Sequence, residues 1–321
     1  MQAIILEQGY YNFNKCPLPL CTPDHVLIKV AYAGVNRADL LQKQGRYPLP
    51  ECSPAIPGME VSGEIVECGN TVAPFKKGAK VCALVSEGGY GEYVLAHQAL
   101  VLPVPEGISL ESAAGLPEAC FTVWISLVWQ AKLKAGETLL IHGGSSGIGS
   151  IAIQIGRLLG ARVFTTSGSD EKCMVCEQCG AVKAINYRKA DYVSIIKEQT
   201  ANQGVDVILD MVGGDYFQRN LECLNKEGRL CIIAFLQGSK MPVNLSPILF
   251  KHLSVMGSTL RARPLQEKAQ IASELYKNVW KAIEKGLVKP VIDQIFPLCD
   301  AEKALLRMEE GLNVGKILLR I

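Results

Sequence analysis

The sequence LLIHGGSSGIG at residues 139–149 decides the fold class. A short apolar run leads into four glycines, and a helical pattern follows from about residue 149 to 159. Glycine permits a tight turn, a close approach of backbone amides to a pyrophosphate and close packing of helix on strand. The start of the helix adds N–H groups and a favourable dipole for phosphates. The glycine spacing departs from G-x-G-x-x-G but serves the same needs, so it predicts a dinucleotide-binding turn.

The residues around and after this turn alternate between strand and helix patterns. Buried strands are expected at residues 138–142, 162–166, 184–187, 206–211, 229–235 and 254–260. Helices are expected between them at residues 149–159, 171–179, 192–200 and 215–224. Six apolar strands separated by helices indicate a parallel sheet covered on both faces, with right-handed crossovers. The predicted fold class is therefore α/β, with a Rossmann-type doubly wound sheet of six strands.

The rest of the chain has a different pattern, rich in short strands broken by glycine and proline. Strands expected at residues 26–32, 60–68, 80–85 and 92–96 suggest a compact, barrel-like unit. After Pro264 we expect a helix to about residue 285, a short helix at 301–310 and a strand at 316–321. We expect these last pieces to return to the β-rich unit, which makes that domain discontinuous in sequence.

The composition limits the classes of function that need be considered. A length of 321 residues suggests two domains, because single cores usually stop growing near about 250–300 residues. A formal charge of +2 gives no expectation of a surface for nucleic acid or an anionic membrane. Neither a signal peptide nor a membrane-spanning apolar run is evident. Twelve scattered cysteines suggest reduced, buried thiols, so we expect a cytoplasmic protein.

The end of the second expected strand bears on the choice of dinucleotide. NAD-specific sites usually place an acidic residue there, about 20 residues after the turn, to bind the ribose 2′-hydroxyl. Here the strand ends in FTTSG at residues 164–168, and Lys172 follows. Small hydroxyl donors and a cation suit a 2′-phosphate, so NADPH is predicted. Asp170 and Glu171 nearby argue the other way and keep NADH as the alternative.

Motifs along the whole chain resemble the zinc-free quinone oxidoreductases of the medium-chain dehydrogenase/reductase superfamily, the zeta-crystallin-like group. They are NRAD at 36–39, QGRYP at 44–48, PGMEVSG at 57–63, GYGEYV at 89–94, PEA at 117–119, the glycine turn, INYR at 185–188 and GKI at 315–317. SG at 146–147 and GSTLR at 257–261 are most similar to the tumour-suppressor-inducible branch. The resemblance implies a GroES-like catalytic domain (1–120 and 262–321), a Rossmann NADPH-binding domain (121–261) and a homodimer or homotetramer.

The resemblance also implies a protein without metal. Zinc-dependent relatives hold their catalytic zinc with Cys and His at positions that are Asn36 and Met59 here, and neither side chain is a usual zinc ligand. The four-cysteine lobe of those relatives is missing after Val94. Cys173, Cys176 and Cys179 have the spacing of an iron–sulfur motif, but that spacing also places them on one apolar face of a helix. We favour the helix.

The residues that surround the reaction are likewise implied by the resemblance. Asn36, Asp39 and Tyr47 are expected at the catalytic site, with loop structuring and simple packing as the alternative roles of Asn36 and Tyr47. The residues expected to bind the cofactor are Thr122, Gly144, Ser145, Ser146, Gly147, Ile148, Ser167, Lys172, Tyr187, Phe235, Leu236 and Lys316. Of these, Lys172, Tyr187 and Lys316 are expected to hold the adenosine phosphate. Arg261 is expected near the end of the last parallel strand, at the mouth of the site.

The predicted activity is zinc-independent transfer of reducing equivalents from NADPH to quinones. An apolar site suffices, because the nicotinamide supplies the chemistry and solvent can protonate the reduced oxygens. An enone or enoyl-thioester reductase is the alternative enzyme, since Tyr47 within GRYP at 45–48 could donate a proton to the substrate. A non-catalytic, crystallin-like NADPH-binding protein is a third possibility, although no RNA-binding surface supports it.

Overall fold

A computed structural model describes residues 1–47 and 56–321 of the chain. The chain divides into two compact units, which we describe separately. The nucleotide-binding unit comprises Thr122–Leu260, and the β-rich unit comprises Met1–Phe121 together with Arg261–Ile321. These limits differ by one residue from the predicted boundaries at 120/121 and 261/262.

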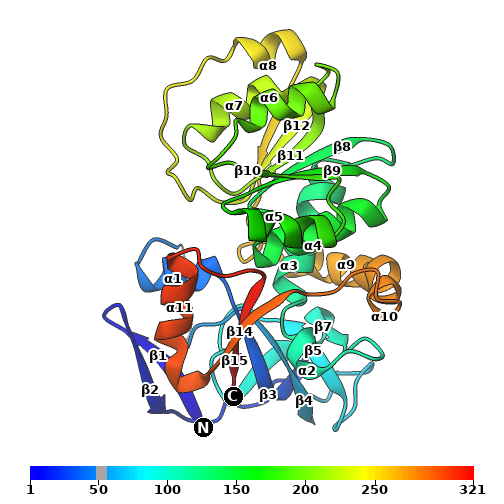
Figure 1. Cartoon of the computed structure of the whole chain (residues 1–321). Coiled ribbons are helices and arrows are strands. Elements are labelled where there is room, and N and C mark those ends of the chain that lie inside the picture. Colours follow the sequence, from blue (N-terminus) through cyan, green and yellow to red (C-terminus); the bar gives the residue numbers. More distant parts are fainter. Residues whose placement is uncertain (48–55) are drawn as a thin grey trace. The chain divides into compact units, whose positions relative to one another are not determined.

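The nucleotide-binding unit contains a six-stranded parallel sheet (Figure 1). Its strands are β8 (Thr138–His142), β9 (Arg162–Ser167), β10 (Lys183–Asn186), β11 (Val205–Asp210), β12 (Leu224–Ile232) and β13 (Ser254–Gly257). Their spatial order is β10-β9-β8-β11-β12-β13, which is the 3-2-1-4-5-6 order of dinucleotide-binding folds. The predicted Rossmann sheet is confirmed. The fifth strand begins earlier than expected, at Leu224.

Helices cover both faces of this sheet. They are α4 (Gly147–Leu158), α5 (Asp170–Gln178), α6 (Tyr192–Gln199), α7 (Tyr216–Cys223) and the short α8 (Ser246–Lys251). On one face, a Cβ added to Gly156 of α4 would lie 2.8 Å from Leu139 of β8. On the other face, Leu140 of β8 belongs to a buried cluster with residues of α6 and α7. Alternate residues of β8 therefore face opposite layers, as a strand buried on both sides requires.

The β-rich unit is built around a sheet with the strand order β14-β15-β3-β4-β5-β7, and β6 also pairs with β3. The strands are β3 (His25–Val35), β4 (Glu60–Cys68), β5 (Lys80–Leu84), β6 (Tyr93–His97), β7 (Val101–Pro103), β14 (Ile292–Pro297) and β15 (Lys316–Arg320). The C-terminal strand β15 pairs with β3, so the predicted return of the chain end is confirmed. The hairpin of β1 (Gln2–Glu7) and β2 (Tyr10–Lys15), and strand β14, were not expected.

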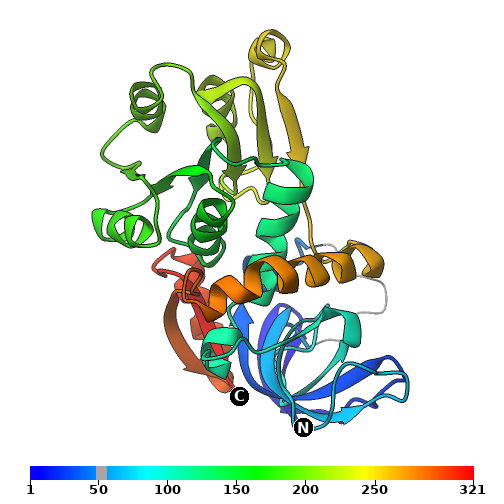
Figure 2. The ribbon, with the colours of Figure 1, turned by 90° about the vertical axis from the view of Figure 1, so that its right-hand side faces the viewer.

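The helices of the β-rich unit lie at its connections. They are α1 (Arg37–Lys43), α2 (Leu110–Ala113), the start of α3 (Pro117–Trp124), α9 (Leu265–Leu275), α10 (Lys281–Glu284) and α11 (Ala301–Glu309). The helix expected after Pro264 is confirmed: it runs through α9, a π-helical turn at Tyr276–Trp280 and α10, in orange in Figure 2. One helical stretch, Leu110–Gln130, is long and apolar enough to cross a membrane, but 83% of its apolar window is buried, which is typical of a core helix.

The eleven described cysteines are all free thiols. Cys173 and Cys176 are buried on α5, and the sulfur of Cys176 lies 3.3 Å from the hydroxyl of Ser167 on β9. Burial raises the pKa of Cys176 to about 12, so this thiol stays protonated at neutral pH. The regularly spaced cysteines of α5 therefore pack the helix against the sheet.

Candidate functional site

The glycine turn after β8 requires glycine at specific positions. A Cβ added to Gly144 would lie 1.9 Å from the hydroxyl oxygen of Thr165. A Cβ added to Gly149 would lie 2.2 Å from the carbonyl oxygen of Gly143, which is backbone and cannot move aside alone. Gly143 has a φ of +69°, in the left-handed region. The turn therefore holds its backbone close to the first turn of α4, as a pyrophosphate cradle requires.

Ser146 fixes the start of α4. Its hydroxyl accepts a hydrogen bond of 3.0 Å from the N–H of Gly149, which makes Ser146 the N-cap. The N–H groups of Gly147 and Ile148 begin the helix and have no acceptor within it. Ser145 and Gly147 are buried beside them. One turn at a helix N-terminus thus contains the predicted residues Gly144, Ser145, Ser146, Gly147 and Ile148, and its free N–H groups have the geometry to bind an anion.

Two of the residues predicted to hold the adenosine phosphate, Lys172 and Tyr187, lie in the nucleotide-binding unit close to the predicted cofactor-binding residue Ser167. Ser167 ends β9, and its carbonyl accepts from the N–H of Tyr187 (3.1 Å), which directly follows β10. A Cβ added to Gly168 would lie 2.8 Å from the Tyr187 hydroxyl, so this phenol lies over the end of β9. Lys172 lies in the first turn of α5, where its N–H binds the N-cap Ser169. Ser167, Lys172 and Tyr187 therefore gather at one edge of the sheet.

The Asp170 carboxylate, whose position in the sequence favoured NADH over NADPH, binds two neighbouring side chains. Asp170 accepts from Asn186 (2.6 Å) and pairs with Lys189 (2.5 Å). These bonds lower the pKa of Asp170, so the carboxylate is ionised and directed to Lys189 rather than to the end of β9. Glu171 stays an ionised carboxylate beside Lys172, because a hydrogen bond with Ser169 lowers its pKa. The Tyr187 hydroxyl and Lys172 suit a phosphate at this edge, whereas Glu171 does not.

Met211, which directly follows β11, was missed by the sequence analysis. The Ser146 hydroxyl lies 3.7 Å from its sulfur, and a Cβ on Gly143 would meet the same sulfur. The carbonyl of Met211 accepts from the N–H of Leu236 (3.1 Å). The predicted residues Phe235 and Leu236 are half exposed in this segment after β12. Thr122 is buried in α3, and its carbonyl accepts from the Ser126 hydroxyl.

A buried polar network beneath the glycine turn was also missed. His142, the last residue of β8, lies 2.9 Å from the Thr166 hydroxyl and 2.7 Å from the amide oxygen of Asn220. The same amide oxygen of Asn220 accepts from the Tyr192 hydroxyl (3.0 Å), and the amide nitrogen donates to the Asp210 carboxylate (3.1 Å). Burial lowers the pKa of His142, so its imidazole is neutral at pH 7. This network ties the ends of β8, β9 and β11 to one another.

The predicted catalytic residue Asn36 lies in a second polar group, in the β-rich unit. Its side chain donates to Glu60 (3.0 Å) and accepts from the Lys316 ammonium (2.7 Å), which also pairs with Glu60. All three side chains are buried. Burial alone lowers the pKa of Lys316, but Glu60, Glu118 and Asp39 raise it above its usual value, so the lysine is charged.

The adenosine-phosphate role of Lys316 stays a prediction, and the surroundings of this lysine do not favour it. The ammonium is occupied by Asn36 and Glu60 within the β-rich unit, and its side chain is only 3% exposed. The same group is unsuited to zinc. The amide of Asn36 already binds Lys316, a cation at this place repels a second cation, and the neighbouring Met59 is a buried thioether. In the residues that the structure describes, no three His, Cys, Asp or Glu side chains are grouped to hold a metal.

Asp39 and Tyr47 lie in the same unit and share one neighbour, Arg261. Asp39 is fully buried and accepts from the Tyr90 hydroxyl (2.8 Å) and from the N–H of Asn36 (2.8 Å). Burial raises the pKa of Asp39 despite these bonds. The Arg261 guanidinium lies 4.7 Å from the centre of the Tyr47 ring and donates to Gln42 (3.0 Å). Pro48, which ends the predicted motif, lies outside the described residues.

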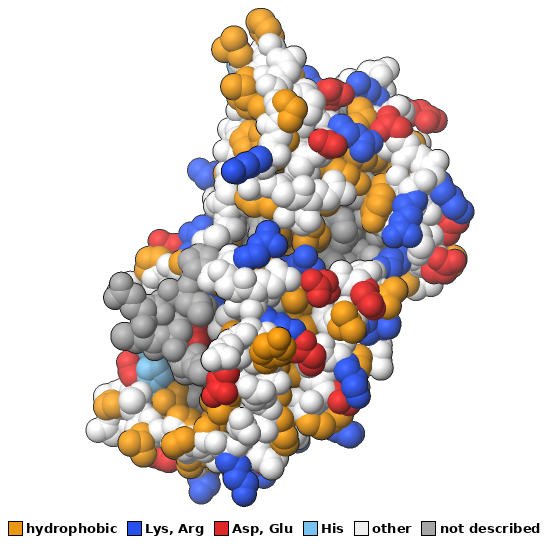
Figure 3. Space-filling view, turned by 90° about the vertical axis from the view of Figure 1, so that its left-hand side faces the viewer, with side chains coloured by type: hydrophobic (Ala, Val, Ile, Leu, Met, Phe, Trp, Pro, Cys, Tyr) orange, Lys and Arg blue, Asp and Glu red, His pale blue; other side chains and the backbone are white. Residues whose placement is uncertain are grey.

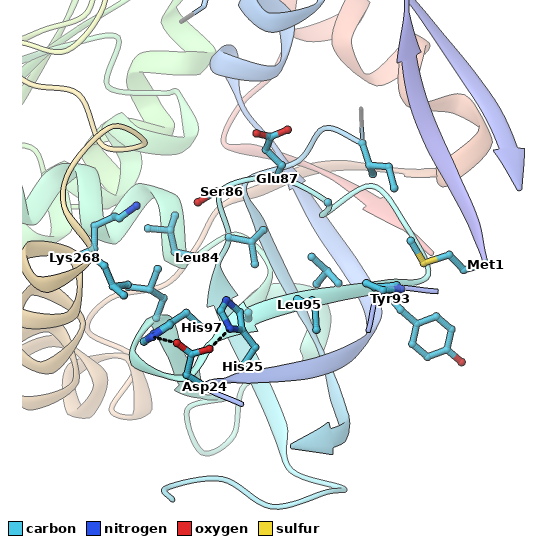
Figure 4. Close-up of a pocket in the computed structure, with 18 of the residues that line it drawn as sticks. Met1, Asp24, His25, Leu84, Ser86, Glu87, Tyr93, Leu95, His97 and Lys268 are labelled. Carbon is cyan, nitrogen blue, oxygen red and sulfur yellow. Dashed lines mark hydrogen bonds and ion pairs between the residues drawn. The ribbon is translucent and has the colours of Figure 1, made fainter. Parts of the chain in front are cut away.

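The β-rich unit also has a pocket of about 660 Å³ (Figure 4). Asp24 lies between two imidazoles in its wall, 2.6 Å from Nδ1 of His25 and 3.3 Å from Nε2 of His97. Lys268 of α9 and Glu87, which follows β5, also line it. None of the predicted site residues is among the described residues of this wall, but the Lys268 ammonium donates to the carbonyl of Arg261 at 3.2 Å.

Comparisons with known proteins agree with this geometry. Residues 22–106 match the alcohol dehydrogenase GroES-like domain, and residues 147–278 match the family described as zinc-binding dehydrogenase. The quinone oxidoreductase of Sus scrofa is 33% identical over 290 residues, covering 89% of this chain and 86% of the relative. The chain belongs to the quinone oxidoreductase family of the medium-chain dehydrogenase/reductase superfamily.

Other members of the family are similar over the same length. Quinone oxidoreductase-like protein 2 of Bos taurus is 32% identical over 300 residues, covering 93% of this chain and 86% of its own. Escherichia coli quinone oxidoreductase, solved in complex with NADPH, has a TM-score of 0.90 at 27% identity and covers 100% of both chains. The family membership, the GroES-like unit and the Rossmann unit that the resemblance implied are thereby confirmed.

Proposed function

We propose that this oxidoreductase transfers reducing equivalents from NADPH to a quinone or another small conjugated carbonyl compound. The observation that carries the proposal is the glycine turn, in which backbone amides and a helix N-terminus form an anion site at the carboxyl end of β8. Two similar structures, from Escherichia coli (27% identical) and a mycobacterium (26% identical), were solved with NADPH. Their fold likeness supports the same cofactor here.

The nucleotide-binding unit has residues suited to each part of this cofactor. Gly144–Ile148 would bind the pyrophosphate through backbone N–H groups. Lys172 and Tyr187 would bind the 2′-phosphate, since the Tyr187 hydroxyl lies over the end of β9 and Lys172 lies in the first turn of α5, which follows β9. Ser167 would line this end of β9 without its hydroxyl, which is buried against the sulfur of Cys176. Thr122, Phe235 and Leu236 would lie against the nicotinamide. When bound, NADPH would supply a hydride, and the acceptor would take the one proton that completes its two-electron reduction from water or a protein hydroxyl.

The β-rich unit would supply the acceptor side of the reaction. Asn36 is held by Glu60 and Lys316, so its amide is fixed in orientation. Burial raises the pKa of Tyr47 and keeps its phenol protonated, which makes it a hydrogen-bond donor to an acceptor oxygen. The same phenol suits proton donation to an enone, so reduction of enones or enoyl thioesters is the second candidate.

The two candidate activities are distinguished by comparing acceptors with the purified protein. NADPH oxidation is measured with 1,4-naphthoquinone, trans-2-hexenal and crotonyl-CoA, in the wild type and in Tyr47→Phe. We expect quinone turnover to exceed enone turnover, and Tyr47→Phe to affect the quinone weakly. A selective loss of enone turnover in Tyr47→Phe would favour the enone reductase. NADPH binding without oxidation by any acceptor would instead favour a non-catalytic NADPH-binding protein.

We propose a cytoplasmic homodimer or homotetramer of the tumour-suppressor-inducible branch, with no metal and with neither nucleic acid nor membrane as partner. Positive and negative side chains are interspersed on the face drawn in Figure 3, which supports the absence of a nucleic-acid surface there. The mass in solution by light scattering tests the oligomer.

A further inference from the structure

The Arg261 guanidinium has an unusual environment for a charged group. Its side chain is only 2% exposed, yet Nε and Nη2 have no hydrogen-bond acceptor in the described part of the chain. Only Nη1 donates, to Gln42 at 3.0 Å. Buried polar groups in folded proteins nearly always have partners, because an unpaired buried donor is costly, and more so when it is charged. This edge of Arg261 therefore indicates a partner that binds from outside the chain.

The two unpaired nitrogens define the kind of group that would bind. Nε–H and an N–H of Nη2 point in parallel from one edge of the guanidinium, which is the geometry that binds oxygen atoms strongly. The Tyr47 ring lies along the guanidinium at 4.7 Å and would bound one side of a flat ligand. The Arg261 guanidinium thus lies over the face of the Tyr47 ring.

Asp39 supplies the counter-charge for this position. Its Oδ2 accepts from Tyr90 and Asn36, while Oδ1 has no hydrogen-bond partner and lies 3.9 Å from Nη2 of Arg261. A distance of 3.9 Å is too long for a direct hydrogen bond, so neither atom satisfies the other. Because the chain covers both atoms, a ligand oxygen would reach them only after a neighbouring side chain moves aside. Such an oxygen would accept from Arg261, and once reduced to a hydroxyl it would donate to Asp39.

We propose that Arg261 is the residue that recognises the acceptor, and that its Nε/Nη2 edge binds the carbonyl oxygen that gains negative charge during reduction. This inference rests on the proposed function, since it assigns a role within that reaction. A fixed cation beside a developing negative charge stabilises the transition state more than the ground state. Removal of Arg261 should therefore lower kcat/KM for the acceptor and leave the binding of NADPH unchanged.

The experiment compares the full-length wild type with Arg261→Met, Arg261→Lys and the control Arg263→Met. Arg263 is a suitable control because it lies two residues away and pairs with Glu267 at 2.7 Å. NADPH affinity is measured by fluorescence titration. Acceptor kinetics are measured with neutral 1,4-naphthoquinone and with 2-hydroxy-1,4-naphthoquinone, which is an anion at neutral pH.

We expect Arg261→Met to lose about 10- to 100-fold in kcat/KM for 1,4-naphthoquinone, the range of a hydrogen bond to a charged group. The loss should be larger for the anionic quinone, and Arg261→Lys should restore the preference between the two acceptors but not the full rate. Arg263→Met and all NADPH affinities should stay within about twofold. If Arg261→Met does not fold, Arg261→Lys tests the role of Arg261 instead, and we expect it to lose about tenfold in kcat/KM for both acceptors.

The results separate this inference from the proposed function. A wild type that binds no NADPH or reduces no acceptor would overturn both. Normal turnover by the wild type with equal kinetics in the Arg261 and Arg263 variants would overturn the role of Arg261 alone. Equal losses for the two quinones, accompanied by weaker NADPH binding, would show that Arg261 only maintains the structure.

Discussion

The two units contain polar groups built in different ways. In the nucleotide-binding unit, the glycine turn offers backbone N–H groups, and its side chains matter mainly because they are small. In the β-rich unit, the polar group is made of side chains, one neutral and two charged, and they come from distant segments of the chain. Asn36 and Glu60 are 24 residues apart, and Asn36 and Lys316 are 280 apart. A backbone site therefore appears in the sequence as a short motif, whereas a side-chain site appears only after the chain has folded.

The largest effect is expected on the free energy of unfolding, when a buried charge of the β-rich unit is removed. Lys316→Met leaves the carboxylate of Glu60 buried without its cation, so we expect a loss of about 3–5 kcal/mol of unfolding free energy. Urea unfolding followed by circular dichroism measures it. The double variant with Glu60→Gln should lose less than Lys316→Met alone, because no unpaired charge remains.

Lys303→Met is the matched control, since Lys303 pairs with Asp300 on the surface and is 70% exposed. It should change stability by less than about 0.5 kcal/mol. The predicted adenosine-phosphate role of Lys316 is tested in the same variants. If Lys316→Met folds and weakens NADPH binding while leaving NADH binding intact, Lys316 holds the 2′-phosphate after all.

The next effect concerns the backbone of the glycine turn. Gly149→Ala places a Cβ against the carbonyl of Gly143, so the turn must open or α4 must move. We expect NADPH affinity to fall about 100-fold, equivalent to about 2.8 kcal/mol. Calorimetry measures it. Gly257→Ala is the control, because its added Cβ meets nothing within 4 Å, and it should bind NADPH like the wild type. Equal affinities of the two variants would contradict the cradle.

The comparison also explains what could be predicted from the sequence. Local sterics decide where glycine is required, and burial decides which strands are apolar. The glycine turn and the strands of the sheet could therefore be predicted from short stretches of sequence. The partners of Lys316 could not be predicted, because a lysine after a glycine carries no sign of a partner 280 residues away. The network of His142, Asn220 and Asp210 was missed for the same reason, since each residue alone is ordinary in its strand or helix.

A smaller effect is expected from the residues at the end of β9. Lys172→Met should weaken NADPH binding about tenfold, or about 1.4 kcal/mol, and leave NADH binding unchanged, because only NADPH carries the 2′-phosphate. Fluorescence titrations with both nucleotides measure this. Lys189→Met is the control, since Lys189 pairs with Asp170 rather than with a phosphate. A parallel loss for NADPH and NADH would show that Lys172 acts on the fold of α5 instead.

The smallest effect is expected on the pH dependence of stability, through His142, which directly precedes the glycine turn. His142 is buried and its pKa is lowered, so the native protein keeps it neutral while the unfolded chain binds a proton below about pH 6.5. Its contribution to stability is therefore present above that pH and is lost as the pH falls, by at most about 1.4 kcal/mol per pH unit. His142→Gln keeps hydrogen-bonding groups but cannot titrate, so urea unfolding at pH 7.5, 6.5 and 5.5 should show a shallower decline than in the wild type. His252→Asn, at an exposed left-handed position, should decline like the wild type. A wild-type slope retained in His142→Gln would mean that the acid sensitivity arises elsewhere, and the glycine turn would then owe its position to backbone packing alone.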